Sequence, residues 1–400
     1  MNGNKKVILH IAFDGVLFDQ VYPRFEEMDR YENIYLLLCN ESNPEIKYIR
    51  HTEKLICAYS VEAWGKFIND PKVDIIYLHG LWYLQAIDYI RPRVIVMWWC
   101  YGKEIYENCY GLPPLMGLQI YKPETFKFIQ SLGGIGFKFL NYLLYYHPKL
   151  YILYITIRRK AFSSTLENRA KLKEMLSRVD YAFTPLQTEL IELKKACPYI
   201  KAKPFILRGV IEKVSINIHK TPGNILLEHS AHFSNNHLDI LAVLKEKKVH
   251  MLGRNVFIPL SYGETRLAER VKEEAKFDGA CVHCLMEALA FAEYKEMLDG
   301  CTHAIFGMIR QSGLGNIYLC FRKGVKVFLF KDSVLYKQFK ADGYYVFSIE
   351  DDLNDISIQE PLTEDQALNN YNIFYSQMHD LGTYQEQMDR ILNDYKNDEH

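Results

Sequence analysis

The chain has 400 residues, of which 49% are hydrophobic and 24% are charged, so it can bury large cores and is neither disordered nor a coiled coil. Its length suggests two domains, and its formal net charge of −1 excludes a global electrostatic attraction to nucleic acid. The 29 tyrosines and 22 phenylalanines are numerous. Such an excess suits a polar-rimmed cleft or a membrane interface, although it also occurs as core filling.

The cysteines and the apolar stretches of the sequence indicate the redox environment of the protein, whether it binds a metal and whether it spans a membrane. The nine cysteines are scattered, and no secretory signal precedes the first strand-like run, so we expect reduced cytosolic thiols. CVHC at 281–284 is the only CxxC pair, and it lies in an apolar, strand-like run without a second close pair, so no metal site is predicted. The most apolar stretch, 139–157, carries His147, Pro148 and Lys149 in its middle, which argues against a transmembrane helix.

The first half of the chain alternates between apolar runs and helical stretches. The runs show little polar alternation, as in parallel strands that are covered on both faces. They lie at 6–15, 33–40, 73–80 and 93–102. A helix is expected at 82–90. Residues 111–165 break the pattern with an aromatic, mostly helical segment that carries seven positive charges against Glu124 alone. A helix at 165–178, a strand at 181–185, a helix at 186–196 and a strand at 203–207 follow.

The second half repeats the alternation after a polar linker. Each of its first four strands is followed by a helix, in the pairs 224–230 and 235–246, 255–263 and 264–276, 280–285 and 288–299, and 303–308 and 314–323. A further strand, a helix from Asp332 and an amphipathic C-terminal helix complete the chain. The predicted class is α/β, with two doubly wound Rossmann-like domains facing across a cleft. The domains are predicted at 1–208, with an insertion at about 111–165, and at 224–380, with a linker at 209–223 and a final helix at 381–400.

In open parallel sheets, ligands bind beyond the carboxyl ends of the strands, so the loops at these ends are the candidate sites. In the second half, HSAHFSNNH at 229–237 offers Ser230, Asn235 and Asn236, which can cap the next helix or expose its N–H groups to a phosphate. Its histidines suit hydrogen bonding better than metal binding. IPLSYG at 258–263 places Tyr262 and Gly263 at the end of the next strand.

IRQSGLGNIYLCF at 309–321 is the strongest candidate loop. Glycines let a main chain approach a ligand closely, a helix N-terminus attracts anions, and an arginine can fork onto a phosphate or a carboxylate. The residues concerned are Arg310, Gln311, Gly313, Gly315 and Asn316. The motif is neither a Walker A sequence nor a GxGxxG fingerprint. It suits a diphosphate, and the alternative is a plain turn with a helix-packing glycine.

The first half has three candidates for a general base. Asp14, His79 and Glu104 each follow a predicted strand, where a side chain can reach a substrate hydroxyl. Each can equally be a structural or capping group. Asp14 is the preferred base, followed by Glu104 and then His79.

The second-half pieces resemble, in order, a known family. ILLEHSAHFSNNHLDIL, VFIPLSYG and EYKEMLDGCTHAIFGMIRQSGLGNIYLCFRKGVKVFL are similar to the core of bacterial 4-acetamido-4,6-dideoxygalactose transferases, which extend lipid-linked intermediates of enterobacterial common antigen. IIYLHG and YGKEIYE in the first half and FSIEDDLND near the end extend the resemblance. The family loop tends to have a glycine and an acid where this chain has Ala231 and His232, and Tyr101 replaces a family tryptophan.

The resemblance implies the GT-B fold, an acceptor-side first domain and a nucleotide-sugar-binding second domain. It implies an inverting, metal-independent glycosyltransferase without cofactor, which uses a dTDP-sugar donor and a polyprenyl-diphosphate-linked acceptor. The enzyme would lie in the cytoplasm, peripherally on the inner face of a bacterial cytoplasmic membrane. By position, the resemblance assigns the donor site to the loops at 229–237, 258–263 and 309–316.

Two other functions fit the same fold. One is a nucleotide-sugar 2-epimerase, which would need no lipid acceptor, and the other is a non-catalytic nucleotide-sugar-binding subunit of a polysaccharide assembly. The basic aromatic segment at 111–165 is a candidate for contact with an anionic membrane. The alternative is a helical hairpin that packs on the first domain or on a partner subunit.

Overall fold

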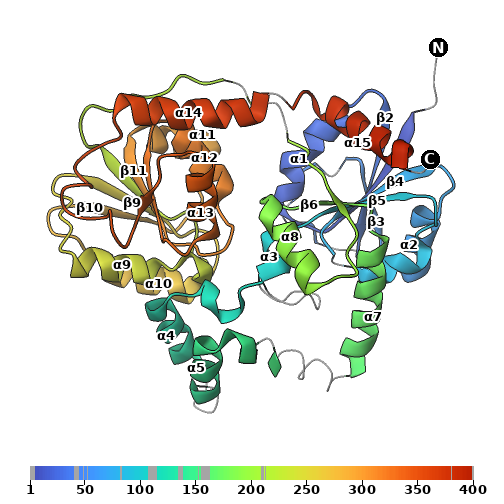
Figure 1. Ribbon diagram of the computed structural model, residues 1–400, viewed down its shortest axis with the longest axis horizontal. Coiled ribbons are helices and arrows are strands. Elements are labelled where there is room, and N and C mark those ends of the chain that lie inside the picture. Colours follow the sequence, from blue (N-terminus) through green and yellow to red (C-terminus); the bar gives the residue numbers. More distant parts are fainter. Residues whose placement is uncertain are drawn as a thin grey trace. The chain divides into compact units, whose positions relative to one another are not determined.

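The computed structural model describes most of the chain, as residues 5–39, 45–47, 49–51, 53–81, 83–106, 115–133, 138–151, 153–154, 163–208, 211, 213–379 and 381–398. The chain forms two compact units (Figure 1). Unit 1 consists of Met1–Gly117, Ile152–Ile211 and Leu381–His400. Unit 2 consists of Leu118–Tyr151 and Glu212–Asp380.

Unit 1 is built on a parallel sheet. Within its described residues, seven strands pair in the order β3-β2-β1-β4-β5-β6-β7. The strands are β1 (Lys6–Ala12), β2 (Tyr31–Leu38), β3 (Leu55–Ala58), β4 (Val73–His79), β5 (Ile95–Trp99), β6 (Tyr181–Phe183) and β7 (Lys203–Pro204). The strand order reverses between β1 and β4, so the loops after these two strands flank the switch point of the sheet.

The connections of unit 1 are mostly helical. They are α1 (Val16–Glu26), α2 (Val61–Ile68), the 3₁₀ helix η1 (Leu84–Tyr89), α3 (Gly102–Tyr106), α7 (Ser163–Arg178) and α8 (Gln187–Ala196). The helix expected at 82–90 is a 3₁₀ helix, and its first predicted residue lies outside the described residues. Pro92 disfavours helical geometry just before it, and Ile90 is already extended.

The C-terminal helix α15 (Tyr384–Asp398) packs on unit 1, beside α1 (Figure 1). Tyr384 and Met388 are buried in the aromatic core beneath α1. Gln387 accepts the main-chain N–H of Arg208 at 2.9 Å and donates to its carbonyl at 2.6 Å. The last helix therefore completes the first core, although unit 2 separates the two in sequence.

Unit 2 repeats the doubly wound plan. Within its described residues, six parallel strands pair in the order β10-β9-β8-β11-β12-β13. The strands are β8 (Asn224–Leu227), β9 (Asn255–Pro259), β10 (Cys281–Leu285), β11 (Cys301–Phe306), β12 (Lys326–Leu329) and β13 (Phe347–Ser348). The helices are α9 (His237–Glu246), α10 (Thr265–Glu274), α11 (Phe291–Asp299), α12 (Leu314–Arg322), α13 (Val334–Ala341) and α14 (Glu364–His379). Both units are Rossmann-like, as the sequence predicts.

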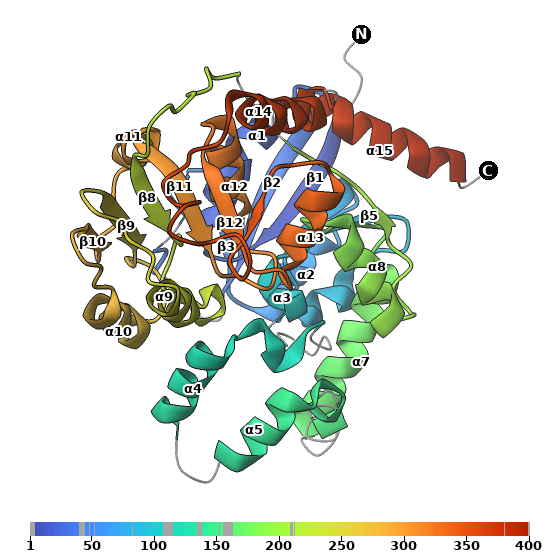
Figure 2. The ribbon, with the colours of Figure 1, turned by 60° about the vertical axis from the view of Figure 1, so that its left-hand side comes forward.

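Residues 118–151, which the sequence analysis places in an insertion of the first domain, group with unit 2 instead. They contain most of η3 (Gly117–Ile120), with α4 (Pro123–Leu132) and α5 (Lys138–Tyr146). α4 packs against α9 (Figure 1 and Figure 2), and Phe126 of α4 stacks on Tyr145 of α5 with ring centroids 4.1 Å apart. Polar contacts from α9 explain the grouping, as described below. Residues 111–114, 134–137, 152 and 155–162 of the predicted insertion lie outside the described residues.

Candidate functional site

The switch point of unit 2 lies between β8 and β11, where the strand order reverses. Ligands of doubly wound sheets bind at this place, beyond the carboxyl ends of the strands. Three loops lie at this switch point or next to it, and the sequence analysis predicted all three as candidate sites. They follow β8, β9 and β11.

A main-chain bridge joins the loops after β8 and β9. Ala231 donates its N–H to the carbonyl of Tyr262 at 2.7 Å, and Glu264 donates to the carbonyl of Ala231 at 2.8 Å. Gly263 has a φ of +123°, and a Cβ there would lie 2.5 Å from the carbonyl oxygen of Ala231. Glycine is therefore required at this crossing. The bridge sets Tyr262, whose residue surface is 65% exposed, beside the loop after β8.

Asn235 and Ser230 hold the loop after β8 in shape. The Asn235 side-chain nitrogen donates to the Ser230 carbonyl at 2.8 Å and lies 3.0 Å from its hydroxyl. Both residues are buried, and Oδ1 of Asn235 has no hydrogen-bond partner among the described residues. An unpaired buried acceptor is costly. It marks a place where a water molecule or a ligand donor is needed.

Asn236 is occupied by internal contacts. Its side-chain nitrogen donates to the carbonyls of Ile120, Ser234 and Gly307, at 3.1, 3.2 and 2.9 Å. Its side-chain oxygen accepts the N–H of Lys122 at 2.8 Å. The residue is fully buried and left-handed, with a φ of +53°. Asn236 therefore fixes the main chain of three segments and presents no exposed group to a ligand.

Arg310 links the loop after β11 to the loop after β8. Its Nε donates to the hydroxyl of Ser234 at 2.9 Å, and its Nη1 donates to the carbonyl of Gln311 at 3.0 Å. The same hydroxyl lies 3.0 Å from Nδ1 of His232. Only 8% of the Arg310 surface is exposed. The guanidinium therefore lies within the loop cluster.

The N-terminus of α12 has the geometry of an anion site. Gly313 is the N-cap, with a left-handed φ of +61°, and its carbonyl accepts the N–H groups of Asn316 at 2.9 Å and Ile317 at 3.1 Å. A Cβ on Gly315, in the first turn, would meet no atom within 4 Å. The side-chain oxygen of Asn316 accepts the hydroxyl of Tyr294 at 3.0 Å. Open space therefore lies beside Gly315, and the N–H groups of Leu314 and Gly315 precede the first hydrogen bond inside the helix.

The sequence analysis did not single out Glu228, the residue after β8. It is fully buried and has a positive φ of 64°, which is uncommon for a residue with a side chain. Burial raises the pKa of its carboxyl group. One carboxylate oxygen accepts the N–H of Gly307, and the other lies 3.1 Å from Nδ1 of His229. The sequence signal that could have identified Glu228 is an acidic residue directly after the apolar strand β8.

In unit 1, Asp14 lies in the loop after β1 and is partly buried. One of its carboxylate oxygens accepts the N–H of Lys47 at 2.7 Å, and the other accepts the N–H of Ile49 at 2.9 Å. Asp14 therefore organises the main chain at 47–49.

His79 ends β4 and faces the aromatic core rather than solvent. It is 1% exposed, and its Nε2 lies 3.1 Å from Nδ1 of His10. Burial lowers its pKa well below the usual value, so the ring is neutral. Its Nδ1 has no hydrogen-bond partner among the described residues. The structure thus supplies a buried histidine pair where the sequence predicted a loop base.

Glu104 closes the first turn of α3. Its two carboxylate oxygens accept the N–H of Leu81 at 2.6 Å and of Tyr101 at 2.8 Å. Burial raises its pKa to about 7, and these main-chain donors partly offset the rise. The carboxylate connects the loop after β4 to the loop after β5.

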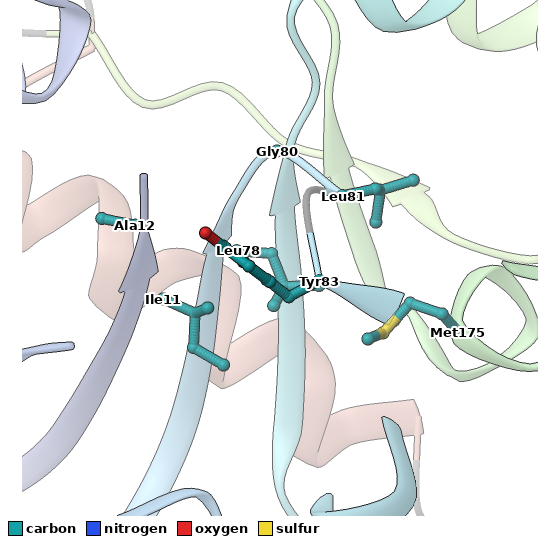
Figure 3. Close-up of a pocket in the computed structure, with 7 residues that line it drawn as sticks. All are labelled: Ile11, Ala12, Leu78, Gly80, Leu81, Tyr83 and Met175. Carbon is teal, nitrogen blue, oxygen red and sulfur yellow. The ribbon is translucent and has the colours of Figure 1, made fainter. Parts of the chain in front are cut away.

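A small pocket lies at the ends of β1 and β4 in unit 1 (Figure 3). Its lining is largely apolar and includes Ile11, Leu78 and Met175. Tyr83 lies across the end of β4, with its hydroxyl on the side of β1 (Figure 3). The pocket opens at the switch point of unit 1, whereas His79 belongs to the other face of the sheet.

Among the described residues, no group of three or more histidine, cysteine, aspartate or glutamate side chains is placed to hold a metal ion. No helix in the described part of the chain is both long and apolar enough to span a membrane.

Residues 208–390 match the model of the 4-alpha-L-fucosyltransferase family, glycosyl transferase group 56. The match confirms the family resemblance over the C-terminal region. Comparison with curated proteins gives no match.

Solved structures that resemble the whole chain include a glycosyltransferase and enzymes of sugar-phosphate synthesis. Sucrose-phosphate synthase from Thermosynechococcus elongatus has a TM-score of 0.60 at 8% identity, with 98% of this chain and 99% of that one covered. A trehalose-6-phosphate protein from E. coli, solved with UDP-2-fluoro glucose, has a TM-score of 0.53 at 7% identity. The comparison covers 97% of this chain and 98% of that one. A lipopolysaccharide outer core galactosyltransferase has a TM-score of 0.51 at 8% identity, and the comparison covers 97% of this chain and 99% of that one.

The predicted GT-B fold is therefore confirmed, and the family match together with the fold identifies the chain as a glycosyltransferase.

Proposed function

We propose that this glycosyltransferase moves a sugar, with inversion, from a dTDP-linked donor to a polyprenyl-diphosphate-linked saccharide in bacterial surface polysaccharide synthesis. The donor site is in unit 2, and its residues are those predicted from the sequence. These are Ser230, Asn235, Asn236, Tyr262, Gly263, Arg310, Gln311, Gly313, Gly315 and Asn316. Some of these residues shape the loops, and the others are proposed to face the ligand.

The observation that carries the donor site is the start of α12. Gly313 opens the helix in a left-handed conformation, and the space beside Gly315 is empty of side chains. A helix N-terminus at a switch point binds phosphate through its N–H groups and its partial positive charge. A nucleoside diphosphate supplies two phosphates at the bond that breaks.

We infer a single in-line displacement. The acceptor hydroxyl attacks the anomeric carbon, the bond from that carbon to the diphosphate breaks, and the hydroxyl proton passes to a base. Negative charge grows on the leaving diphosphate, where preorganised donors are each worth about 3 kcal/mol at the transition state. The first-turn amides of α12 and Arg310 are the proposed donors. Asn236 and Ser230 act by holding these groups in place.

Asp14 remains the preferred base. It is partly buried and lies on a loop at the switch point of unit 1, whereas Glu104 and His79 are each only 1% exposed. The main-chain donors at 47 and 49 hold the Asp14 carboxylate in one orientation. An Asp14→Asn variant keeps the acceptor geometry in part but removes the base, so turnover should fall while donor binding survives. Normal turnover would remove Asp14 from this role.

Peripheral membrane contact is proposed for α5 and the residues after it. The outer face of α5 carries exposed apolar side chains at helical spacing, namely Leu140, Leu143 and Tyr146, and Leu150 after the helix is also exposed. Its inner face carries Leu144, which is buried, and Tyr145, which stacks on α4. Residues 118–154 contain four lysines and one glutamate. An apolar stripe among basic residues suits an anionic lipid surface, where a lipid-linked acceptor would lie.

A ligand screen tests the proposal. Calorimetric titration with dTDP, UDP, GDP and CMP should show selective binding of dTDP. Incubation of the donor sugar with and without a lipid-linked acceptor then separates transfer from epimerisation, because an epimerase changes the sugar without acceptor. A preference for GDP or CMP would overturn the donor assignment.

A further inference from the structure

Glu228 and His229 form a hydrogen-bonded pair at the switch point of unit 2. The carboxylate of Glu228 is fully buried, and its Oε2 lies 3.1 Å from Nδ1 of His229. The other oxygen accepts the N–H of Gly307, which follows β11. The carboxylate is thereby anchored to β11 and orients the imidazole by its Nδ1.

The imidazole lies against the N-cap of α12. A Cβ on Gly313 would come within 2.8 Å of Cε1 and 2.9 Å of Nδ1 of His229. The ring therefore occupies the space that a side chain on Gly313 would fill. About 13% of the His229 side chain is exposed, and its Nε2 has no hydrogen-bond partner among the described residues. The unused nitrogen thus belongs to a ring seated beside the first turn of α12.

The pairing determines the protonation chemistry. With Nδ1–H donating to the carboxylate, Nε2 is an acceptor in the neutral ring and becomes a donor when the ring is protonated. Between the Glu228 carboxylate and an anionic ligand, both ring nitrogens face acceptors, and both can donate only when both carry a proton. The other titratable groups here are His237 on α9, whose pKa burial lowers to about 3, and Tyr294 on α11. Arg310, after β11, reaches Ser234 in the loop that carries His229.

We propose that His229, oriented by Glu228, donates its Nε2–H to a phosphate oxygen of the bound nucleoside diphosphate. The pair then makes the site selective for the diphosphate group over the bare nucleoside. Glu228 is a positioning residue, since it acts through the imidazole. This inference rests on the proposed donor site and adds to it a side-chain donor that is not among the site residues predicted from the sequence.

Two substitutions test the pair by calorimetry with dTDP and with thymidine. His229→Leu should weaken dTDP binding by about tenfold or more, as expected for a charge-assisted hydrogen bond, and should leave thymidine binding unchanged. His229→Gln, which can place an amide N–H near the same position, should recover part of the loss. Equal weakening of both ligands would show a structural role and overturn the inference, as would unchanged dTDP binding.

Glu228→Gln gives an independent readout of the pair. Its side-chain amide can donate to Nδ1, which leaves Nε2–H as a donor in the neutral ring, so this variant should keep more of the dTDP affinity than His229→Leu. Equal losses of dTDP affinity in Glu228→Gln and His229→Leu would contradict the inference. Failure of wild type to bind dTDP would instead contradict the proposed donor site.

Discussion

The side-chain nitrogen of Asn236 donates to the main-chain carbonyl of Gly307 at 2.9 Å, which ties the start of α9 to the end of β11. The same side chain contacts the main chain at residues 120 and 122. One turn further along α9, Asp239 accepts the N–H groups of Glu124 at 2.8 Å and Thr125 at 3.0 Å, and so caps α4 from a neighbouring helix. Residues 118–132 are thus attached to unit 2 through the loops of its candidate site.

Substitution of Asn236 should loosen this attachment. Asn236→Gly keeps the left-handed conformation and removes only the side chain, so it should cost about 1–3 kcal/mol through unpaired buried main-chain groups. Hydrogen exchange should accelerate at residues 118–132. Asn369→Gly is a matched control, because this exposed amide donates to the Gly343 carbonyl elsewhere in unit 2. Unchanged exchange at 118–132 would show that the clamp contributes nothing.

Arg310→Ala should lower kcat by about a hundredfold or more through loss of a donor to the leaving diphosphate. The fold should survive, because the guanidinium contacts loops rather than the core. Arg322→Ala serves as the control, since Arg322 lies in the last turn of α12 and contacts Tyr375. Steady-state kinetics and thermal unfolding of both variants check this. Near-normal turnover in Arg310→Ala would remove this side chain from the chemistry.

His10 should lower the free energy of unfolding of unit 1 as the pH falls from neutral to acidic values. Burial lowers its folded pKa to about 4, whereas the unfolded value is 6.5, so the unfolded chain binds the extra proton and stability falls as pH drops below 6.5. At pH 5 the loss is about 2 kcal/mol. Urea unfolding followed by hydrogen exchange in unit 1 should therefore show His10→Gln gaining about 2 kcal/mol relative to wild type between pH 7.5 and pH 5. A constant difference across this range would mean that His10 does not remain neutral in the folded state.

The exposed apolar side chains of α5, together with Leu150 after the helix, should bind anionic vesicles. A Leu140→Gln, Leu143→Gln and Leu150→Gln triple variant should co-sediment less with vesicles that contain anionic lipid, because it removes apolar area from the interface. Ile191→Gln, at an equally exposed apolar position on α8, is the control. Wild type should bind neutral vesicles more weakly than anionic ones. Equal binding of wild type to both vesicle types, or equal binding by the triple variant, would count against membrane contact.

The buried parallel strands were predictable from sequence because apolar runs without alternation have few other solutions. The strands at 73–80 and 303–308, for example, are β4 and β11 with small shifts at their ends. The bounds of α1 were not predicted, because Pro23 lies inside the helix. The return of α15 to unit 1 depends on long-range packing of Tyr384 and Met388, which no local pattern reports.

The loops of the candidate site were predictable, but the tasks of individual residues were not. Asn236 and Gly313 are both N-cap residues of helices. The side chain of Asn236 makes hydrogen bonds to main-chain groups, whereas the first turn after Gly313 has open space beside Gly315. The difference comes from residues 118–122, more than a hundred positions away. Glu228 was not predicted as a site residue, because its carboxylate is held by the N–H of Gly307. Only the parallel pairing of β8 with β11 brings Gly307 near it.

Gly315 offers the most direct test of the donor site, because stability and binding should change in opposite directions. A Cβ there meets no atom within 4 Å, and alanine is favoured over glycine in a helix by about 1 kcal/mol. Calorimetric titration of dTDP into Gly315→Ala and Gly315→Val should show affinity reduced by about tenfold or more, with a larger loss for valine, while the Tm of Gly315→Ala does not fall. Unchanged dTDP affinity in both variants would contradict a diphosphate at the N-terminus of α12.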